Sequence, residues 1–129
     1  MTQARASTSH LRPVPFWPRC VSSDAEPDGW HYVSPFPIEG DPQEFWSALT
    51  AAVRALPGTT VVEETRRTLR AECRSRVFGF VDDLELCMRP TVGEVAVRSG
   101  SRWGIHDGGS NRRRVEELRA MIGKVAAPA

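Results

Sequence analysis

The fold is decided by residues 78–104, which read FGFVDDLELCMRPTVGEVAVRSGSRWG. Apolar and polar side chains alternate over residues 83–89 and again over residues 94–99, so each segment is predicted to be a strand with one apolar face. The intervening Pro-Thr-Val-Gly at residues 90–93 is typical of a hairpin loop. These two strands are therefore expected to pair with each other in antiparallel fashion.

Two more strands are predicted before this hairpin. Residues 59–65 are rich in β-branched side chains, and residues 68–74 again alternate between apolar and polar. The pattern leaves two readings open for Arg66 and Arg67, which either form a turn between two strands or a bend within one long strand.

A helix is predicted to begin after Asp41. This aspartate can serve as the N-cap, with Pro42 at the first helical position and Glu44 completing a capping box. Pro57 and Gly58 end the segment. Apolar residues recur at helical spacing between these limits, at Phe45, Leu49, Ala52, Val53 and Leu56.

A second helix is predicted after Gly108 and Gly109, with Ser110 or Asn111 as its cap. Its apolar stripe comprises Val115, Leu118, Met121, Ile122 and Val125. The expected fold is a two-layer α+β domain, in which an antiparallel sheet of about four strands carries two helices on one face.

The segment before the first helix is rich in proline and aromatic residues. Residues 1–18 are predicted to be a mobile or extended N-terminal tail, and residues 19–125 a single α+β domain. Residues 20–23 are expected to form a turn that docks against the core.

Composition and net charge limit the classes of protein to which this chain is expected to belong. The 129 residues are 40% hydrophobic and 26% charged, which is typical of one globular domain. The net charge of +1 predicts no nucleic-acid partner. No apolar run is long enough to span a membrane, and the first residues lack a signal peptide, so a cytoplasmic protein with three reduced cysteines is expected.

Motifs along most of the chain after Arg19 carry a family resemblance. In chain order they are Cys20-Val21-Ser22-Ser23, His31, Pro35, Val61-Val62, Thr65, Ala71-Glu72, Ser75, Phe78-Gly79-Phe80-Val81-Asp82-Asp83, Val97-Arg98-Ser99, Ser101-Arg102, Gly104, Asp107, Gly109 and Asn111-Arg112-Arg113-Arg114-Val115-Glu116. Together they resemble the family of domains of unknown function numbered 1499 (DUF1499). The resemblance implies no particular activity, because the family has none assigned. It implies an exported or membrane-attached location for many relatives, which carry a leader before the cysteine motif, whereas this chain shows none.

Strand pairing places acidic residues together on the polar face of the predicted sheet. If Arg89 pairs with Glu94, then Glu85 lies opposite Arg98. If a turn after Arg74 pairs it with Asp83, then Glu72 lies opposite Glu85. Glu72, Glu85 and Arg98 would then form one row, with neighbours about 5 Å apart.

Such a row has two interpretations. Adjacent carboxylates can differ in pKa and act as acid and base, so Glu72 with Glu85, or Asp82 with Asp83, could serve a hydrolase. The alternative, which we favour, is a structural ladder in which arginines offset the acids on a solvated face.

The loop before the second helix is the other candidate site. Glycines at a helix N-terminus leave backbone N–H groups free to bind an anion, and the arginines at residues 112–114 add positive charge. If Asp82 and Asp83 pair with Arg98 and Arg102, an arginine of this run remains for a ligand. The candidate ligand-binding residues are Arg98, Arg102, Asp107, Gly108, Gly109, Ser110, Asn111 and Arg112. The alternative is an internal network of Asp82 or Asp83 with Arg102 or Arg112 that fixes the loops.

Other chemistries find less support in the sequence. No second histidine stands at ligand spacing from His106, so neither a metal nor a cofactor is predicted. His31 is expected to be packed and His106 exposed. Cys20 with His31 could suggest a thiol nucleophile, but no oxyanion motif accompanies them.

The expected function is that of a small binding or accessory domain rather than an enzyme. Its ligand would be an anionic or polar small molecule held where the loop at residues 78–83 meets the loop at residues 99–111. One alternative is the carboxylate-dependent hydrolase. Another is a domain that presents Trp17, Trp30 and Trp103 to a protein partner. The sequence leaves the oligomeric state open.

Overall fold

The structure is a computed structural model that describes residues 11–75, 79–104 and 107–126, with the side chains of residues 124–126 excepted. Its elements are β1 (Cys20–Ser22), β2 (Phe36–Pro37), α2 (Pro42–Ala55), β3 (Thr59–Glu64), β4 (Thr68–Arg74), β5 (Val81–Arg89), the 3-10 turn η1 (Pro90–Val92), β6 (Glu94–Ser101) and α3 (Ser110–Ala126). All strand pairs are antiparallel, in the order β1-β6-β5-β4-β3, and β2 also pairs with β6. The α+β prediction is confirmed.

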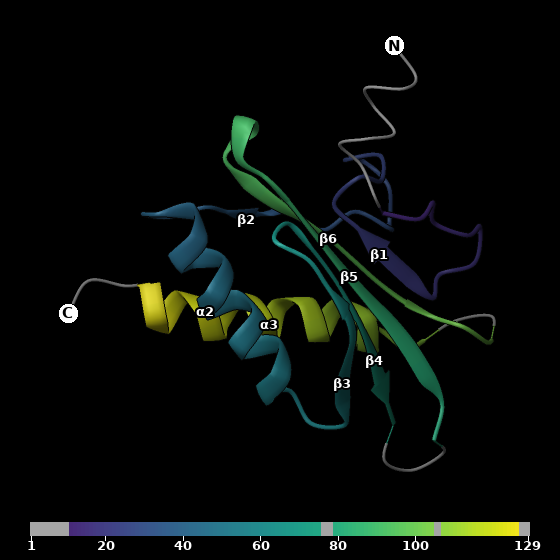
Figure 1. Ribbon diagram of the computed structural model, residues 1–129. Helices are drawn as coiled ribbons and strands as arrows, with labels where there is room; N and C mark the ends of the chain where they lie inside the picture. Colours follow the sequence, from purple (N-terminus) through teal and green to yellow (C-terminus); the bar gives the residue numbers. More distant parts are fainter. Residues whose placement is uncertain (1–10, 76–78, 105–106, 127–129) are drawn as a thin grey trace.

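The sheet has six strands where the sequence predicted about four. Both additional strands come from the N-terminal segment, which supplies β1 and β2 to the free edge of β6 (Figure 1). The prediction of a turn at residues 20–23 was wrong, because Cys20–Ser22 pairs with β6 from Gly100 to Arg98. A segment of three residues is too short for periodicity to identify it as a strand.

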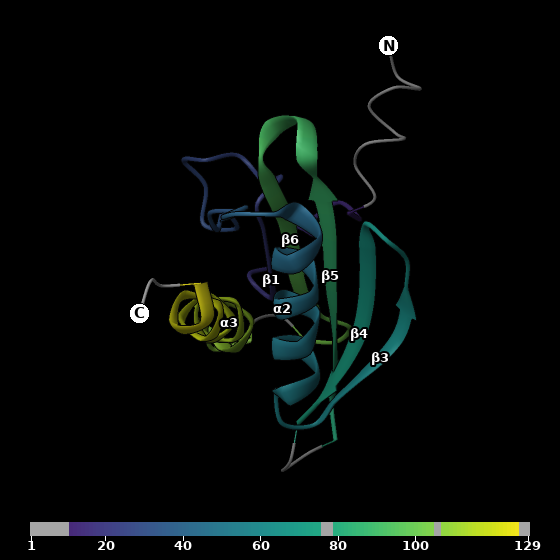
Figure 2. The ribbon, with the colours of Figure 1, turned by 60° about the vertical axis from the view of Figure 1, so that its left-hand side comes forward.

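Both helices cover the same face of the sheet, as predicted (Figures 1 and 2). The core between the layers contains the predicted apolar residues of the strands and both helices. It comprises Val21, Val33, Phe36, Phe45, Trp46, Leu49, Ala52, Val53, Leu56, Leu69, Ala71, Cys73, Leu84, Leu86, Met88, Val95, Val97, Val115, Leu118 and Ile122. Val125 was predicted to join this stripe, but its side chain lies outside the described residues.

The helix starts differ in how well the sequence identified them. At α2, the Asp41 carboxylate accepts a hydrogen bond from the Glu44 amide at 3.0 Å, as predicted. At α3, the cap is Asp107 rather than Ser110 or Asn111, because the Asp107 carboxylate accepts the amides of Gly109 (2.7 Å) and Asn111 (3.3 Å).

Strand register was predicted correctly for one hairpin only. Arg89 lies opposite Glu94 and Glu85 opposite Arg98, as expected. Arg74, however, lies opposite Val81 rather than Asp83, so the connection is two residues shorter than predicted.

The hydrogen bonds of Ser75 explain this shorter connection. The Ser75 amide donates to the Phe80 carbonyl, and the Ser75 hydroxyl accepts from the Phe80 amide. Phe78, which belonged to the predicted loop, lies outside the described residues.

The open question at Arg66 and Arg67 is resolved as a turn. The Thr65 hydroxyl accepts the amides of Arg67 (3.2 Å) and Thr68 (3.0 Å), which folds the chain back so that β3 and β4 pair.

Candidate functional site

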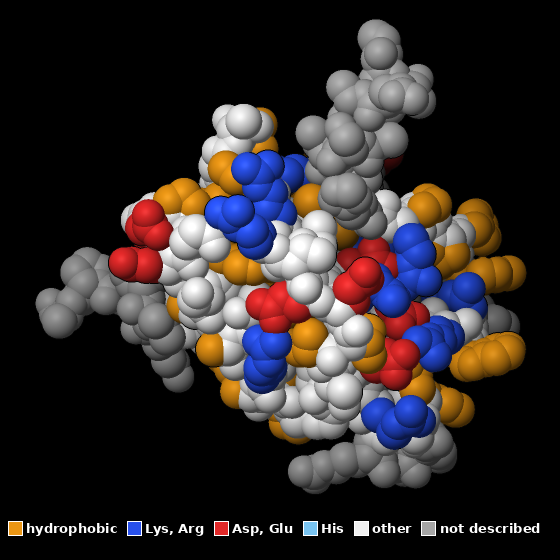
Figure 3. All heavy atoms as spheres, viewed as in Figure 1, with side chains coloured by type: hydrophobic (Ala, Val, Ile, Leu, Met, Phe, Trp, Pro, Cys, Tyr) orange, Lys and Arg blue, Asp and Glu red, His pale blue; other side chains and the backbone are white. Residues whose placement is uncertain are grey.

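The face of the sheet turned away from the helices, called the outer face here, carries a cluster of acidic and basic side chains (Figure 3). Its two central rows follow from the strand pairing. Glu72, Asp83, Gly100 and Cys20 form one row, and Arg70, Glu85, Arg98 and Ser22 form the next. The predicted row of Glu72, Glu85 and Arg98 was therefore wrong, because the register of β4 differs by two residues.

Residues 11–19, called the strap here, run across part of this face. The Arg12 amide donates to the Glu85 carboxylate at 3.1 Å, and the Arg12 guanidinium binds both Glu85 and Asp83. Arg98 donates to the Pro13 carbonyl at 3.2 Å. The strap leaves only 3% of Glu85 exposed, so the expectation of a solvated face does not hold for this part of the sheet.

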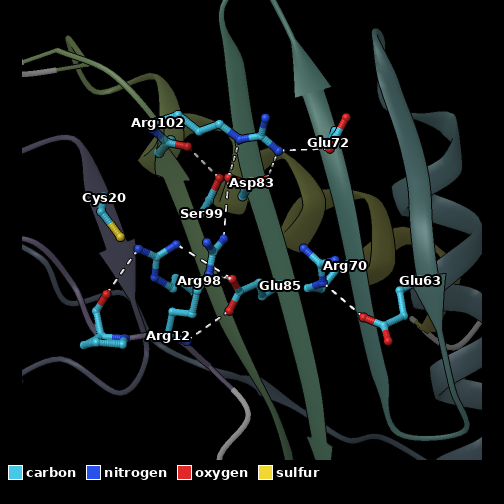
Figure 4. A network of polar contacts seen from close by, with 12 residues as sticks. Arg12, Cys20, Glu63, Arg70, Glu72, Asp83, Glu85, Arg98, Ser99 and Arg102 are labelled. Atoms are coloured by element: carbon cyan, nitrogen blue, oxygen red, sulfur yellow. Dashed lines mark hydrogen bonds and ion pairs between the residues drawn. The ribbon is translucent and has the colours of Figure 1, made fainter.

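Asp83 is held ionised by its neighbours. Arg102 binds both of its carboxylate oxygens at 2.8 Å, and Arg102 also reaches Glu72 at 2.9 Å (Figure 4). The Arg102 hydrogen bonds hold the pKa of Asp83 below its ordinary value of 3.8, against the opposing effect of burial. The predicted pairing of Arg102 with Asp83 is confirmed.

Asp82 points to the opposite, helix-bearing face and has a different partner. Its carboxylate lies 2.9 Å from the Arg114 guanidinium on α3. The sequence had suggested Arg98, Arg102 or Arg112 for this role, and all three were wrong. Arg98 and Arg102 could not serve both aspartates, because adjacent residues of a strand face opposite sides of the sheet. Arg98 instead lies 4.0 Å from Glu85.

A cavity of about 400 Å³ lies between the strap and the ends of β5 and β6. We call it the arginine cavity, and its lining residues are Arg12, Pro13, Val14, Pro15, Arg19, Asp83, Arg98, Gly100, Ser101 and Arg102. Two of these arginines, Arg98 and Arg102, were predicted to bind a ligand. The other two, Arg12 and Arg19, were missed, since the strap gave no periodic signal.

Two guanidinium groups of the arginine cavity are incompletely paired. The Nε atoms of Arg19 and Arg98 are buried, and neither has a hydrogen-bond acceptor among the described residues. Arg98 is itself only 8% exposed. Leaving a buried donor without an acceptor costs about 1–3 kcal/mol, so such groups are rare in folded proteins.

Cys20 and Arg98 meet over Gly100 at the edge of the cavity. A Cβ atom at Gly100 would lie 3.0 Å from the Cys20 sulfur and 3.1 Å from Arg98 Nη1, so glycine permits this close approach. Burial raises the pKa of the Cys20 thiol to about 11. The thiol is therefore protonated near neutral pH, which disfavours the nucleophile reading. His31 is half-buried, as expected, with Nδ1 2.8 Å from the Cys20 carbonyl oxygen.

The loop before α3 is occupied by internal contacts. The Asp107 carboxylate accepts hydrogen bonds from the backbone amides of Gly109 and Asn111 at the start of α3. It also accepts one from the Asn111 side-chain amide at 2.8 Å. Asn111 is fully buried and accepts from Ser99 at 2.7 Å. Arg112 donates to the carbonyls of Tyr32 (2.9 Å) and Trp30. The candidate residues 107–112 thus form a structural tie between α3, β6 and the N-terminal segment, and none of them lines the arginine cavity.

Metal and membrane features are not found in the described residues. The histidine, cysteine and acidic side chains there form no cluster that could hold a metal ion. None of the helices in the same ranges is long and apolar enough to cross a membrane. His106, considered as a ligand from the sequence, lies outside the described residues.

Sequence comparison identifies the family. No curated protein matches the chain. The model of a family described as "Protein of unknown function (DUF1499)" matches residues 10–122, which include the strap, the whole sheet and most of α3. The chain therefore belongs to the DUF1499 family, as its motifs had indicated.

Proposed function

We propose that this domain is a binding module that holds a small anion in the arginine cavity. The observation that carries the proposal is a pair of buried Nε–H groups, those of Arg19 and Arg98, which find no acceptor among the described residues and belong to side chains that line one cavity. A ligand carboxylate or phosphate would give these donors acceptors, and arginine binds both kinds of group in a fork geometry.

The balance of charge around the arginine cavity supports an anionic ligand. Three carboxylates, those of Glu72, Asp83 and Glu85, bind to Arg12, Arg98 and Arg102. The fourth arginine, Arg19, donates to the Gly104 carbonyl at 2.9 Å. No carboxylate within the described ranges pairs with Arg19, and a bound anion would supply the counter-ion that a carbonyl contact does not.

The same contacts favour binding over acid–base catalysis. A general acid needs a raised pKa, whereas the pKa of Asp83 is lowered by Arg102. Glu85 receives two hydrogen bonds from Arg12 and is nearly inaccessible. These carboxylates position arginines, and the arginines supply the ligand contacts.

A ligand reaches the buried N–H donors of Arg19 and Arg98 only if the strap shifts slightly. The middle of the strap, which lines the cavity, consists of Pro13, Val14 and Pro15. Proline has no backbone N–H, so neither proline can donate a backbone hydrogen bond that would anchor the strap. A ligand that displaces the Pro13 carbonyl from Arg98 would take over that hydrogen bond.

Titration calorimetry with inorganic phosphate and with acetate, at constant ionic strength, tests the proposal. We expect binding of the wild-type protein that weakens as salt rises, because the contact is electrostatic. Arg19→Gln should weaken binding by about tenfold, as expected for loss of one charge-assisted hydrogen bond.

Arg113→Gln is the matched control, since it removes the same charge at the start of α3. Arg113 is exposed and donates to the Gly108 carbonyl, away from the arginine cavity. Equal losses in Arg19→Gln and Arg113→Gln would contradict a local site. Absence of binding to both anions by the wild-type protein would overturn the proposal.

A further inference from the structure

Several large aromatic side chains of the described residues are exposed to solvent. The described residues include five large aromatic side chains with high exposure, namely Phe16, Trp17, Trp30, Phe80 and Trp103. Phe16 and Trp103 directly follow the cavity-lining residues Pro15 and Arg102. Hydrophobic side chains project from the margin of the molecule beside the charged cluster (Figure 3).

Backbone hydrogen bonds bring the segments that carry four of these residues, Phe16, Trp17, Phe80 and Trp103, to the same end of β6. The Arg102 amide donates to the Val81 carbonyl, which places Phe80 next to the chain that carries Trp103. The Ser101 amide donates to the Arg19 carbonyl, which brings the end of the strap to the same strand end. The rings of Phe16 and Trp17 pack edge to face with centroids 5.3 Å apart. We call Phe16, Trp17, Phe80 and Trp103 the aromatic rim.

The surroundings of Trp30 differ from those of the aromatic rim. Trp30 packs against His31 and lies under the Arg112 guanidinium at 5.0 Å, which is an internal structural contact. Trp103, in contrast, is 75% exposed and Phe16 is 85% exposed. Single exposed apolar residues are normal, but a group of them beside a polar cavity is typical of a binding surface.

We propose that the arginine cavity and the aromatic rim form one amphiphilic site, whose ligand is an anion that carries an apolar group. This inference rests on the proposed function, since the cavity takes the anionic end. The apolar group lies against the rim and buries surface that the free protein exposes to water. Charge and shape together select an alkyl or aryl phosphate or carboxylate over the bare anion.

The test compares inorganic phosphate with hexyl phosphate, each titrated into the full chain. Hexyl phosphate should bind at least about tenfold tighter, because burial of roughly two methylene groups is enough for that factor. Phe16→Ala with Trp103→Ala should abolish this preference and leave the affinity for inorganic phosphate unchanged. Trp30→Ala is the matched control, which should keep the preference.

The outcomes separate the two proposals. If hexyl phosphate binds no tighter than inorganic phosphate, the amphiphilic site is overturned while anion binding stands. If neither binds, both proposals fail. If the double variant keeps the full preference, the aromatic rim is not part of the site and this inference is overturned.

A second arm distinguishes a free amphiphile from a lipid as its source. The protein is sedimented with phosphatidylcholine vesicles that either contain or lack phosphatidylglycerol. Co-sedimentation that requires phosphatidylglycerol and is lost in Phe16→Ala with Trp103→Ala supports the site with a lipid as ligand. Tight binding of hexyl phosphate without co-sedimentation supports it with a free amphiphile.

Discussion

At the scale of single residues, the outer face is organised by arginines that hold carboxylates. Arg12 reaches both Asp83 and Glu85, and Arg102 spans Glu72 and Asp83. Because Asp83 and Glu85 are paired, their burial is tolerated. The arginines are fixed in place in return, which is what a preorganised anion site requires.

A pH dependence follows from Asp83. Its pKa is lowered in the folded protein, so ionisation of this group stabilises the fold above its unfolded pKa. That stabilisation is lost as pH falls through the lower, folded value, in the range below about pH 4. We therefore expect the pKa of Asp83, measured by NMR titration, to lie below 3.8 in the wild-type protein.

The variant Arg102→Gln tests the cause. Without the guanidinium, the pKa of Asp83 should rise, and the unfolding free energy should fall less steeply between about pH 5 and about pH 2. Arg113→Gln, which removes a distant positive charge, should leave the titration of Asp83 unchanged. An unaltered pKa in Arg102→Gln would assign the shift to Arg12 instead.

At the scale of elements, α3 is attached to the sheet by polar side chains as well as by its apolar stripe. Asp107 caps the helix and orients Asn111, and Asn111 in turn contacts Ser99 on β6. Arg114 adds the ion pair with Asp82 on β5. This tie fixes the end of β6, from which Arg102 and Trp103 project.

Asp107→Ala should destabilise the protein by about 1–3 kcal/mol, because it removes the helix cap and an acceptor of the buried Asn111 amide. Ser110→Ala, at a cap position named from the sequence, should change stability by less than about 0.5 kcal/mol. Urea denaturation of the two variants measures the difference. Equal losses would mean that Asp107 does not cap α3.

At the scale of the whole molecule, the helices and the strap cover opposite faces of one sheet. The helix side is an apolar core, and the strap side is a set of paired charges around the arginine cavity. The apolar core and the proposed binding site therefore lie on different faces, so a variant on one face is expected to leave the other intact.

Leu86→Ala tests the core side. Leu86 is 1% exposed in the central strand β5, and its truncation should cost roughly 2–5 kcal/mol in unfolding free energy. Val92→Ala is the control, since Val92 lies exposed in the hairpin loop. A loss in Leu86→Ala no larger than that in Val92→Ala would contradict the strand orientation, whereas phosphate affinity should be unchanged in both.

The sequence by itself determined the elements whose signal is local. Alternation of apolar residues located the central strands, helical spacing located both helices, and Asp41 marked the start of α2 through a side chain three residues from its partner. The strand register of the β5–β6 hairpin was predicted correctly, because the short loop at residues 90–93 leaves little freedom in how the two strands pair.

Only the tertiary structure showed which residues come together in the candidate site. The connection from Arg74 to Val81 is longer, and sequence pattern does not fix its length, so the partner of Glu72 was predicted wrongly. Arg12 and Arg19 belong to a segment without periodicity, and their contacts with Glu85 and Gly104 span more than seventy residues of chain. Contacts at that separation depend on how layers pack rather than on local propensity, which is why the arginine cavity emerges only from the folded chain.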